Sequence, residues 1–187
     1  MRQLQNTEQR YGVVAIVLHW LMAALLIALV ALGLYMVSLP DAGFETRKIT
    51  LILYHKQLGI LALTLVALRL AWRVGNALPS LVATLPEWQK VTARFVHLSF
   101  YALMFALPVS GWLMSSAAGI PVSFFGWFDL PDLVAHDESR FRALIEIHKW
   151  LAYALMVCIA VHMGAALRHH LVSKDDTLAK MLPGVRP

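Results

Sequence analysis

The sequence predicts an all-α integral membrane protein, built as one bundle of four spanning helices with both termini on the cytoplasmic side. The 187 residues are 59% hydrophobic and 14% charged, whereas soluble domains carry about 25% charged residues. Four apolar stretches are each long enough to cross a bilayer, which takes roughly 20 apolar residues. The connections between them are too short for a further domain, so residues 1–187 are expected to form a single transmembrane domain.

Each apolar stretch has recognisable ends. The first is too long for the apolar core of a cleavable signal peptide, and turn-forming residues follow it at 40–43. The second ends in an aromatic and basic membrane anchor. The third is expected to break near Pro108 with a kink, and the small side chain at Gly111 permits close approach of a neighbouring helix or a cofactor. The predicted spans are, in chain order, about Val13 to Leu39, Leu51 to Trp72, Phe95 to Met114 and Leu144 to Leu167.

The longest connection, at about 115–142, is dense in aromatic residues between positions 124 and 128. Such a segment is expected to lie at the membrane interface or to cap the bundle. A short amphipathic helix is expected near Asp132 to Phe141. The N-terminal residues 1–12 are polar and are expected to be amphipathic or loose.

Basic residues predict the orientation of the bundle. The N-terminus, the second connection and the C-terminal tail, with their flanks, hold ten of the sixteen Lys and Arg residues. Most of the acidic residues fall on the opposite side. Because basic residues favour the cytoplasmic side of a membrane protein, both termini are expected to face the cytoplasm. The net charge of +5 follows from this bias, and no basic stripe with interleaved aromatic residues indicates nucleic-acid binding.

Two histidines in the fourth stretch, His148 and His162, are fourteen residues apart. In an α-helix this spacing brings them back to nearly the same face, about 21 Å apart along the axis. The pair would therefore lie near the two sides of a bilayer. An imidazole is costly to bury in lipid unless it binds something, and axial ligation of haem iron is the leading explanation for both residues.

Depth in the membrane predicts the partners of these two histidines. On the external side only His55 lies at the depth of His148, so these two are expected to form one pair. On the cytoplasmic side His19 and His97 are both candidates to pair with His162. We favour His19, because it lies about as far from its helix end as His162, whereas His97 is closer to the interface, where a histidine can be solvated.

Other interpretations of the histidines are weaker. Each can be hydrogen-bonded between helices, and His136, in a polar connection, is expected to be solvated. No His-Glu-x-x-His motif occurs and the deep histidines lack nearby carboxylates, which disfavours zinc. The helix centres hold no acidic residues, which disfavours a proton relay. Since no Cys-x-x-Cys-His motif is present, any haem is expected to be non-covalently held haem b.

With these features together, the sequence resembles the bacterial cytochrome b561 family, four-helix membrane cytochromes with two haems. The resemblance spans nearly the whole chain, and its motifs are specific in combination rather than singly. The matching stretches are His19-Trp20, His55-Lys56-x-x-Gly59, Arg69-Leu70-x-x-Arg73, Ala106-Leu107-Pro108-Val109-Ser110-Gly111-Trp112, the pair His148 and His162, and a tail with His169-His170, Asp175-Asp176-Thr177-Leu178 and Met181-Leu182-Pro183.

The resemblance implies two haem b groups, with His19 and His162 as axial ligands of the cytoplasmic-side haem and His55 and His148 as ligands of the external-side haem. It also implies electron transfer to or from ubiquinone. Characterised bacterial members look like superoxide oxidases, which pass electrons from superoxide to ubiquinone. The expected location is the bacterial inner membrane, with the lipid bilayer, ubiquinone and superoxide or another redox donor as partners.

Supporting roles can be suggested for several charged residues. His169, seven residues beyond His162, is a candidate to contact a quinone headgroup or a haem propionate. Arg69, Arg73 and Arg94 are candidates to neutralise haem propionates. Five external cations are candidates to steer an anion such as superoxide, although such side chains usually reach towards lipid headgroups. These five are Lys48, Lys56, Arg140, Arg142 and Lys149.

Two other classes of function stay open at this point. The chain can be an electron-transfer module that takes electrons from a dehydrogenase or a soluble cytochrome. More remotely, it can be a haem-free structural or transport protein of the membrane.

Overall fold

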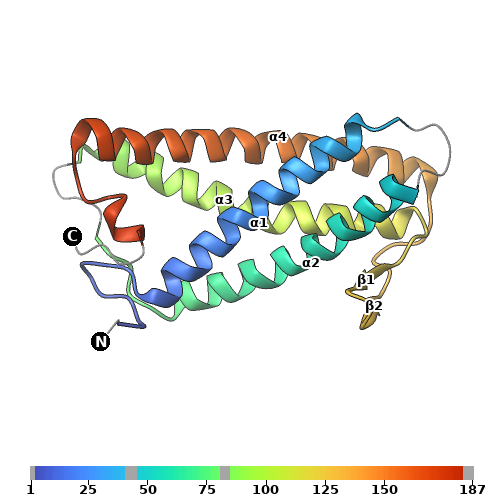
Figure 1. Cartoon of the computed structure of the whole chain (residues 1–187), viewed down its shortest axis with the longest axis horizontal. Coiled ribbons are helices and arrows are strands. Elements are labelled where there is room, and N and C mark those ends of the chain that lie inside the picture. The colour runs from blue at the N-terminus through green and yellow to red at the C-terminus, as the bar shows by residue number, and fades with distance from the viewer. Residues whose placement is uncertain (1–2, 41–45, 81–84, 183–187) are drawn as a thin grey trace.

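The structure, a computed structural model, describes residues 3–40, 46–80 and 85–182 and is dominated by four long helices (Figure 1). All four are long and apolar enough to cross a membrane, which confirms the predicted spanning helices. A π-helical turn η1 and a short 3₁₀ helix η2 follow the fourth helix, and a two-stranded hairpin precedes it. The elements are α1 (Val13–Ser38), α2 (Thr46–Val74), α3 (Glu87–Ala117), β1 (Val122–Phe124), β2 (Phe128–Leu130), α4 (Glu138–Arg168), η1 (His169–Ser173) and η2 (Ala179–Met181).

The helices extend further than their apolar stretches. Helix α3 begins at Glu87 rather than near Phe95, and α4 begins at Glu138 rather than near Leu144. Polar turns can continue a helix beyond the hydrocarbon region, and a search for apolar runs does not count them. Helix α3 continues through Pro108 to Ala117, so the kink predicted at this residue does not end the helix. The turn predicted at 40–43 lies largely outside the described residues.

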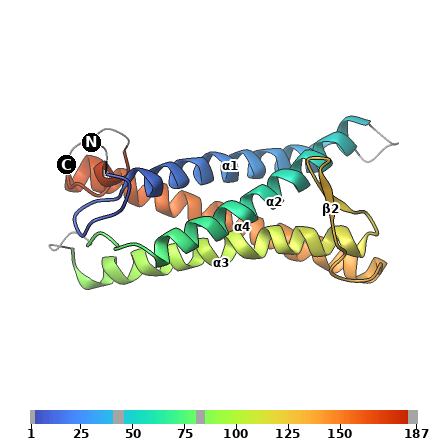
Figure 2. The same cartoon turned by 90° about the horizontal axis from the view of Figure 1, so that it is seen from below.

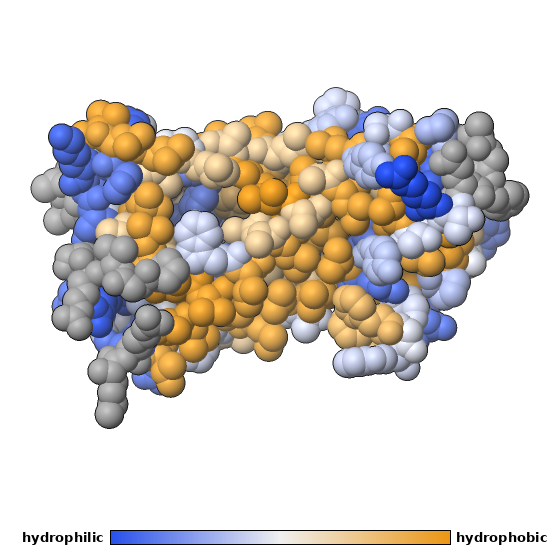
Figure 3. Space-filling view, in the orientation of Figure 1, coloured by the Kyte–Doolittle hydropathy of each residue, from blue (hydrophilic) through white to orange (hydrophobic). Residues whose placement is uncertain are grey.

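Three pairs of neighbouring helices pack closely: α1 on α2, α2 on α3, and α3 on α4. The buried core between them is small and consists of side chains from all four helices. Many other large apolar side chains are exposed, as in Leu98, 68% exposed, and Val157, 62% exposed. Figure 3 shows them as a hydrophobic band between two more polar ends, as expected for a surface that faces lipid. The core residues are Met22, Leu26, Val66, Met104 and Leu155.

Both termini lie at one end of the bundle and the β-hairpin lies at the other (Figure 1). We call these the termini end and the hairpin end. The N-terminal segment, described from residue 3, is not helical, and it is held on the α2–α3 connection by a hydrogen bond of 2.9 Å from Ser80 N to Glu8 O. The Trp20 indole donates a bond of 2.7 Å to Met181 O, which ties α1 to the C-terminal tail.

The hairpin occupies the connection that was expected to contain a short helix. Between Asp132 and Asp137 the chain is not helical, so the amphipathic helix predicted near Asp132 to Phe141 is wrong. Asp137 instead caps α4, since its side chain accepts a bond of 2.8 Å from Arg140 N. Strand β1 packs beside α2 and α3, and Figure 2 shows the hairpin crossing this end of the bundle. The position supports the expectation that the aromatic connection caps the bundle.

Candidate functional site

The structure brings the four favoured histidines together in two pairs, one towards each end of α4. At the hairpin end, the ring centroids of His55 on α2 and His148 on α4 are 6.3 Å apart. At the termini end, those of His19 on α1 and His162 on α4 are 6.2 Å apart. Each of the two pairs expected from depth in the membrane thus has its two rings at similar, short separation.

Both pairs join α4 to a helix against which it does not pack closely. The closely packed neighbour of α4 is α3, whereas His19 lies on α1 and His55 on α2. Closely packed helices approach to about 8–10 Å between axes, which leaves space only for their own side chains. Facing histidines on more widely spaced helices suit a group that is held between them.

The hairpin-end pair has features that fit a bound haem. The Nδ1 atom of His55 is buried and has no hydrogen-bond partner among the described residues. A buried polar atom without a partner is costly. Iron bound by the other ring nitrogen would leave Nδ1 unpaired, so the fit to a haem rests on the placement of the two rings. Both rings are also seated against glycine: a Cβ at Gly33 would lie 3.4 Å from His55 Cε1, and a Cβ at Gly111 would lie 3.3 Å from His148 Cε1.

His148 is held from the side of α3. Its Nδ1 lies 2.9 Å from Ser110 Oγ, and the same hydroxyl donates a bond of 2.8 Å to Leu107 O. Ser110 is buried, with 5% of its surface exposed. Sequence reasoning singled out Gly111 as a place of close approach but missed Ser110, because a serine in a membrane helix has no signature that separates ligand support from a local backbone bond.

The termini-end pair has a third histidine beside it. The His97 ring centroid is 5.6 Å from that of His162, closer than that of His19. The His97 side chain is exposed, however, whereas those of His19 and His162 are half-buried. His97 Nδ1 donates a bond of 2.7 Å to Ala93 O on its own helix. Exposure thus favours His19 as the partner of His162, and ring distance alone does not.

The three predicted arginines lie near this end but not at one point. Arg69 Nη2 is 3.1 Å from His19 Nδ1. Arg73 and Arg94 line a cavity of about 670 Å³ between α2 and α3, and Arg73 lies over the ring of Tyr101 at 5.7 Å. Trp72, one helical turn from Arg69, has a buried Nε1 without a partner in the described part of the chain.

The cavity has a mixed lining, with a few polar groups among mostly apolar side chains. His97, Ser80 and Tyr11 contribute polar groups, and leucine, alanine, proline and phenylalanine side chains form much of the rest. Burial raises the pKa of the Tyr11 phenol above its ordinary value of 10, although the charges of Arg73 and Arg69 oppose the shift. The Tyr11 hydroxyl is therefore protonated at neutral pH and can donate a hydrogen bond into this cavity.

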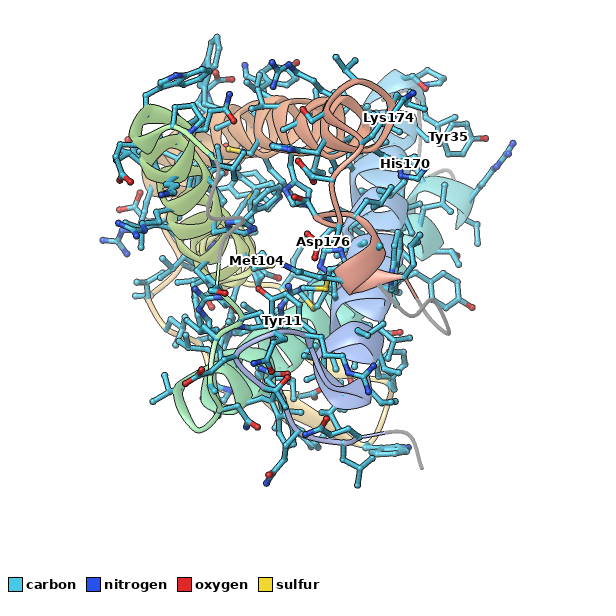
Figure 4. All side chains as sticks on the ribbon, turned by 90° about the vertical axis from the view of Figure 1, so that its left-hand side faces the viewer. Tyr11, Tyr35, Met104, His170, Lys174 and Asp176 are labelled. Atoms are coloured by element: carbon cyan, nitrogen blue, oxygen red, sulfur yellow. The ribbon has the colours of Figure 1, made fainter. Side chains whose placement is uncertain are left out.

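His169 lies elsewhere at the termini end. Its Nδ1 is 2.6 Å from Asp175 Oδ2, in a pair that fixes the tail against η1, and it does not line the cavity. Figure 4, which looks onto this end, shows His170 and Lys174 at its edge and Tyr11 nearer its middle. His169 therefore does not line the cavity that Arg73 and Arg94 line.

The cations expected to steer an anion at the hairpin end all have local partners. These partners are backbone carbonyl groups or carboxylates one helical turn away, so the charges are partly satisfied within the protein. The contacts are Lys48 Nζ to Leu39 O at 3.1 Å, Lys56 Nζ to Pro121 O at 2.8 Å, Arg140 Nη1 to Ala135 O at 3.2 Å, Arg142 Nε to Glu138 Oε1 at 2.9 Å and Lys149 Nζ to Glu146 Oε2 at 2.5 Å.

His136 is exposed, and its Nδ1 donates a hydrogen bond of 2.9 Å to Ala117 O. This bond stabilises the connection between α3 and α4. Within residues 3–40, 46–80 and 85–182, no three His, Cys, Asp or Glu side chains are placed to hold a metal ion between them. Two facing imidazoles, as in the pairs of His55 with His148 and of His19 with His162, are the donor set of an axially ligated haem.

Known proteins carry the same pattern. A family model described as prokaryotic cytochrome b561 matches residues 10–184. "Cytochrome b561 homolog 2" of Escherichia coli (strain K12) is 38% identical over 177 residues, which cover 95% of this chain and 93% of that protein. "Cytochrome b561 homolog 1" of the same strain is 36% identical over 130 residues, or 69% of this chain and 73% of that protein.

A weaker match carries a more specific name. The "Probable superoxide oxidase CybB" of Yersinia pestis is 28% identical over 181 residues, covering 96% of this chain and 99% of that protein. The family implies haem b, which the paired histidines fit. With a family model matched over nearly its whole length, this chain belongs to the prokaryotic cytochrome b561 family and is a membrane electron-transfer protein.

Proposed function

We propose that this chain is a di-haem cytochrome that carries electrons across the bacterial inner membrane to ubiquinone, with superoxide as its electron donor. The observation that carries the proposal is the placement of two facing histidine pairs towards opposite ends of one helix, α4. Two haem groups at these positions would span much of the membrane. One haem at either position would serve only one side.

The ligands follow from the two pairs. His55 and His148 would hold the haem at the hairpin end, and His19 and His162 would hold the haem at the termini end. Bound haem b supplies reversible one-electron oxidation and reduction of its iron. The protein contributes the axial nitrogens, a low-dielectric surrounding and the groups that compensate the haem carboxylates.

Three donors at the termini end suit haem propionates. Arg69, Arg73 and Arg94 are guanidinium groups, which form charge-assisted hydrogen bonds to carboxylates. Arg69 and Trp72 share a face of α2, and the buried Trp72 Nε1 lacks a partner among the described residues. An incoming carboxylate would satisfy it.

The cavity beside His97 is the place in this structure that best suits a ubiquinone headgroup. Its apolar walls suit an isoprenoid tail, and the protonated Tyr11 hydroxyl can donate to a quinone carbonyl. Because His97 Nδ1 donates to Ala93 O, the proton of a neutral ring lies on Nδ1 and its Nε2 can accept a hydrogen bond. This placement replaces His169 as the favoured quinone contact, since His169 is paired with Asp175.

The overall reaction balances without a further reactant. Two superoxide anions would each lose one electron and leave as oxygen. One ubiquinone would gain the two electrons and two protons and leave as ubiquinol. The charge bias that predicts cytoplasmic termini would place proton uptake on the cytoplasmic side, at the cavity, and electron entry on the external side, beneath the hairpin.

The contacts of the external cations favour a second candidate, an electron-transfer module that is fed by a dehydrogenase or a soluble cytochrome. Lys56 is bonded to a backbone carbonyl group, and Arg142 and Lys149 are each paired with a glutamate. These contacts weaken the attraction of the three cations for a small anion. The hairpin also presents exposed aromatic side chains, with Trp127 81% exposed and Phe128 57% exposed. A protein donor could dock there.

Rapid-mixing spectroscopy of the purified protein tests the proposal. The reduced-minus-oxidised spectrum should show haem b, with two haems per chain in the wild type and one in His148→Ala. Superoxide should reduce the haem within the mixing experiment, and ubiquinone should reoxidise it. If superoxide leaves a fully loaded protein oxidised, the superoxide assignment is wrong and the second candidate stands.

A further inference from the structure

We propose that Ser110 is a positioning residue for His148, whose ring it fixes with Nδ1 protonated and with Nε2 free to bind haem iron opposite His55. The inference rests on the proposed function, in which His148 is an axial ligand. It adds a residue on a third helix, α3, that contacts the ring of His148. The serine is buried and its hydroxyl is 2.9 Å from His148 Nδ1.

The hydrogen-bond directions follow from the atoms that Ser110 contacts. A hydroxyl has one proton to donate, and Leu107 O, 2.8 Å from Oγ, is a carbonyl that can only accept. The proton must therefore point to Leu107. The hydroxyl oxygen then accepts from His148, so Nδ1 carries the imidazole proton and the lone pair of Nε2 is free.

The position of the ring is fixed as well as its tautomer. Helices α3 and α4 are a closely packed pair, so the Ser110 backbone cannot move far relative to His148. Gly111 follows directly, and a Cβ there would lie 3.3 Å from His148 Cε1 and 3.6 Å from Nδ1. The hydroxyl and the glycine together contact the Nδ1–Cε1 edge of the ring.

His55 has no equivalent support. Its Nδ1 is buried without a hydrogen-bond partner in the part of the chain that the structure describes. A hydrogen bond from the outer ring nitrogen makes a histidine ligand more basic. The two ligands of the hairpin-end haem are thus unequal, and the Ser110 contact would set the donor strength of the stronger one.

A purely local role is the competing explanation. Serine hydroxyls in helices commonly bond to a backbone carbonyl three or four residues earlier, as Ser110 does to Leu107. A residue with that role alone would affect helix stability and nothing else. The test therefore needs measurements that stability does not change.

The experiment compares Ser110→Ala with Ser115→Ala in a His162→Ala background, which should hold haem only at the hairpin end. Ser115 is a matched control, because it is also a buried serine of α3 but its hydroxyl bonds to Ile120 O at 2.6 Å instead of a histidine. We expect Ser110→Ala to lower haem affinity by about 10-fold to 100-fold. Its midpoint potential should rise, because a less basic ligand stabilises ferric iron less. Its low-temperature electron paramagnetic resonance spectrum should change as the ring loses its fixed orientation.

Two further variants keep the test decisive if Ser110→Ala folds poorly. Ser110→Thr and Ser110→Val have nearly the same shape, but only threonine retains the hydroxyl. We expect threonine to restore the wild-type potential and spectrum, and valine to resemble alanine. Equal values in the Thr and Val variants, or equal values in Ser110→Ala and Ser115→Ala, would overturn the proposal.

Failure of the proposed function gives a different result. If His148 is not a ligand, His148→Ala in the same background keeps its haem, and the Ser110 comparison has no bearing on that haem. If His148→Ala loses the haem while all Ser110 variants keep the wild-type potential and affinity, the ligand assignment stands and the positioning role is wrong.

Discussion

Arg69 of α2 and His19 of α1 are joined by a hydrogen bond of 3.1 Å between Nη2 and Nδ1. A guanidinium group only donates, so His19 Nδ1 accepts, and the neutral ring carries its proton on Nε2. For Nε2 to bind haem iron, Arg69 must release Nδ1. A haem propionate is a better acceptor for Arg69, because the bond is then charge-assisted on both sides. The predicted roles of the two residues are therefore linked.

Replacing Arg69 should change the potential of the termini-end haem more than its occupancy. In a His148→Ala background, Arg69→Met should lower the midpoint potential by tens of millivolts, since one nearby cation contributes about 1–2 kcal/mol at an effective dielectric constant near 20. Arg69→Lys should keep most of the wild-type value. Arg47, at the far end of the same helix and bonded to the Tyr35 hydroxyl, provides the control variant Arg47→Met. Redox titration measures these midpoint potentials. Equal shifts in Arg69→Met and Arg47→Met would contradict an interaction between Arg69 and the termini-end haem.

Much of the fold could be predicted because lipid imposes a simple rule. Backbone polar groups must be satisfied within each spanning segment, so an apolar run such as that of α1 indicates a helix whatever packs beside it. The polar ends of α3 and α4 could not be located in this way, because Glu87 and Glu138 begin helices outside the hydrocarbon region. The hairpin was missed because Phe125, with φ of +52°, adopts a conformation that its side chain does not favour.

Within the site, spacing along helices could locate the four favoured histidines. It could not reveal contacts between helices. The bond of His148 to Ser110, the orphaned Nδ1 of His55 and the cavity beside His97 depend on how α2, α3 and α4 face one another. Spacing also could not predict that His169 would pair with Asp175, six residues further along the chain.

The choice between His19 and His97 can be tested by counting haem. His19→Ala should hold one haem per chain, and His97→Ala should hold two, because the His97 side chain is exposed beside the cavity while His19 is half-buried against His162. We expect His97→Ala to slow reoxidation by ubiquinone instead. Haem and protein assays on the same samples give the ratio. Loss of a haem in His97→Ala with both retained in His19→Ala would reverse the assignment.

Adding a methyl group at Gly111 should weaken haem binding at the hairpin end only. In Gly111→Ala the new methyl would be 3.3 Å from His148 Cε1, so the ring would have to move by a few tenths of an ångström. Gly164→Ala on α4 is the control, because nothing lies within 4 Å of the position of its added Cβ. We expect the hairpin-end haem of Gly111→Ala to dissociate faster to a haem-binding acceptor protein, and that of Gly164→Ala to keep the wild-type rate. Equal rates in the two variants would show that the close approach at Gly111 has no role.

The contact between Asp175 and His169 should keep the C-terminal tail ordered until the pH becomes low. Burial opposes ionisation, but hydrogen bonds from Thr177 and His169 outweigh it and lower the pKa of the Asp175 carboxyl below its ordinary value of 3.8. The ionised carboxylate therefore stabilises the tail at every pH above 3.8, and this contribution is lost as the pH falls through the lower, folded-state pKa.

Hydrogen exchange of residues 174–182 measures this effect. Asp175→Asn should raise exchange at neutral pH, and the wild type should reach the same level only below pH 3.8. Asp176→Asn is the control, since Asp176 is 44% exposed and pairs with Lys180 at 3.3 Å. Reduction of ubiquinone should be little changed by Asp175→Asn. A large loss of that reaction with an ordered tail would restore His169 as a quinone contact.

Lys56 should act as the anchor of the hairpin. Its ammonium group donates to Ile120 O at 3.4 Å and to Pro121 O at 2.8 Å, directly before β1, and it neighbours the predicted ligand His55. Lys56→Met keeps the aliphatic length but removes both bonds, so backbone amides of 119–130 should exchange faster. Lys149→Met is the control, because that lysine pairs with Glu146 on its own helix.

The same two variants also test whether cations draw superoxide to this end. An anchoring role predicts that Lys56→Met changes hairpin exchange while the rate of haem reduction by superoxide keeps its wild-type dependence on salt. A steering role predicts that Lys56→Met and Lys149→Met both slow that reduction at low salt and converge with the wild type at high salt, because screening removes the field. Unchanged hairpin exchange in Lys56→Met would contradict the anchor, whatever the superoxide rate.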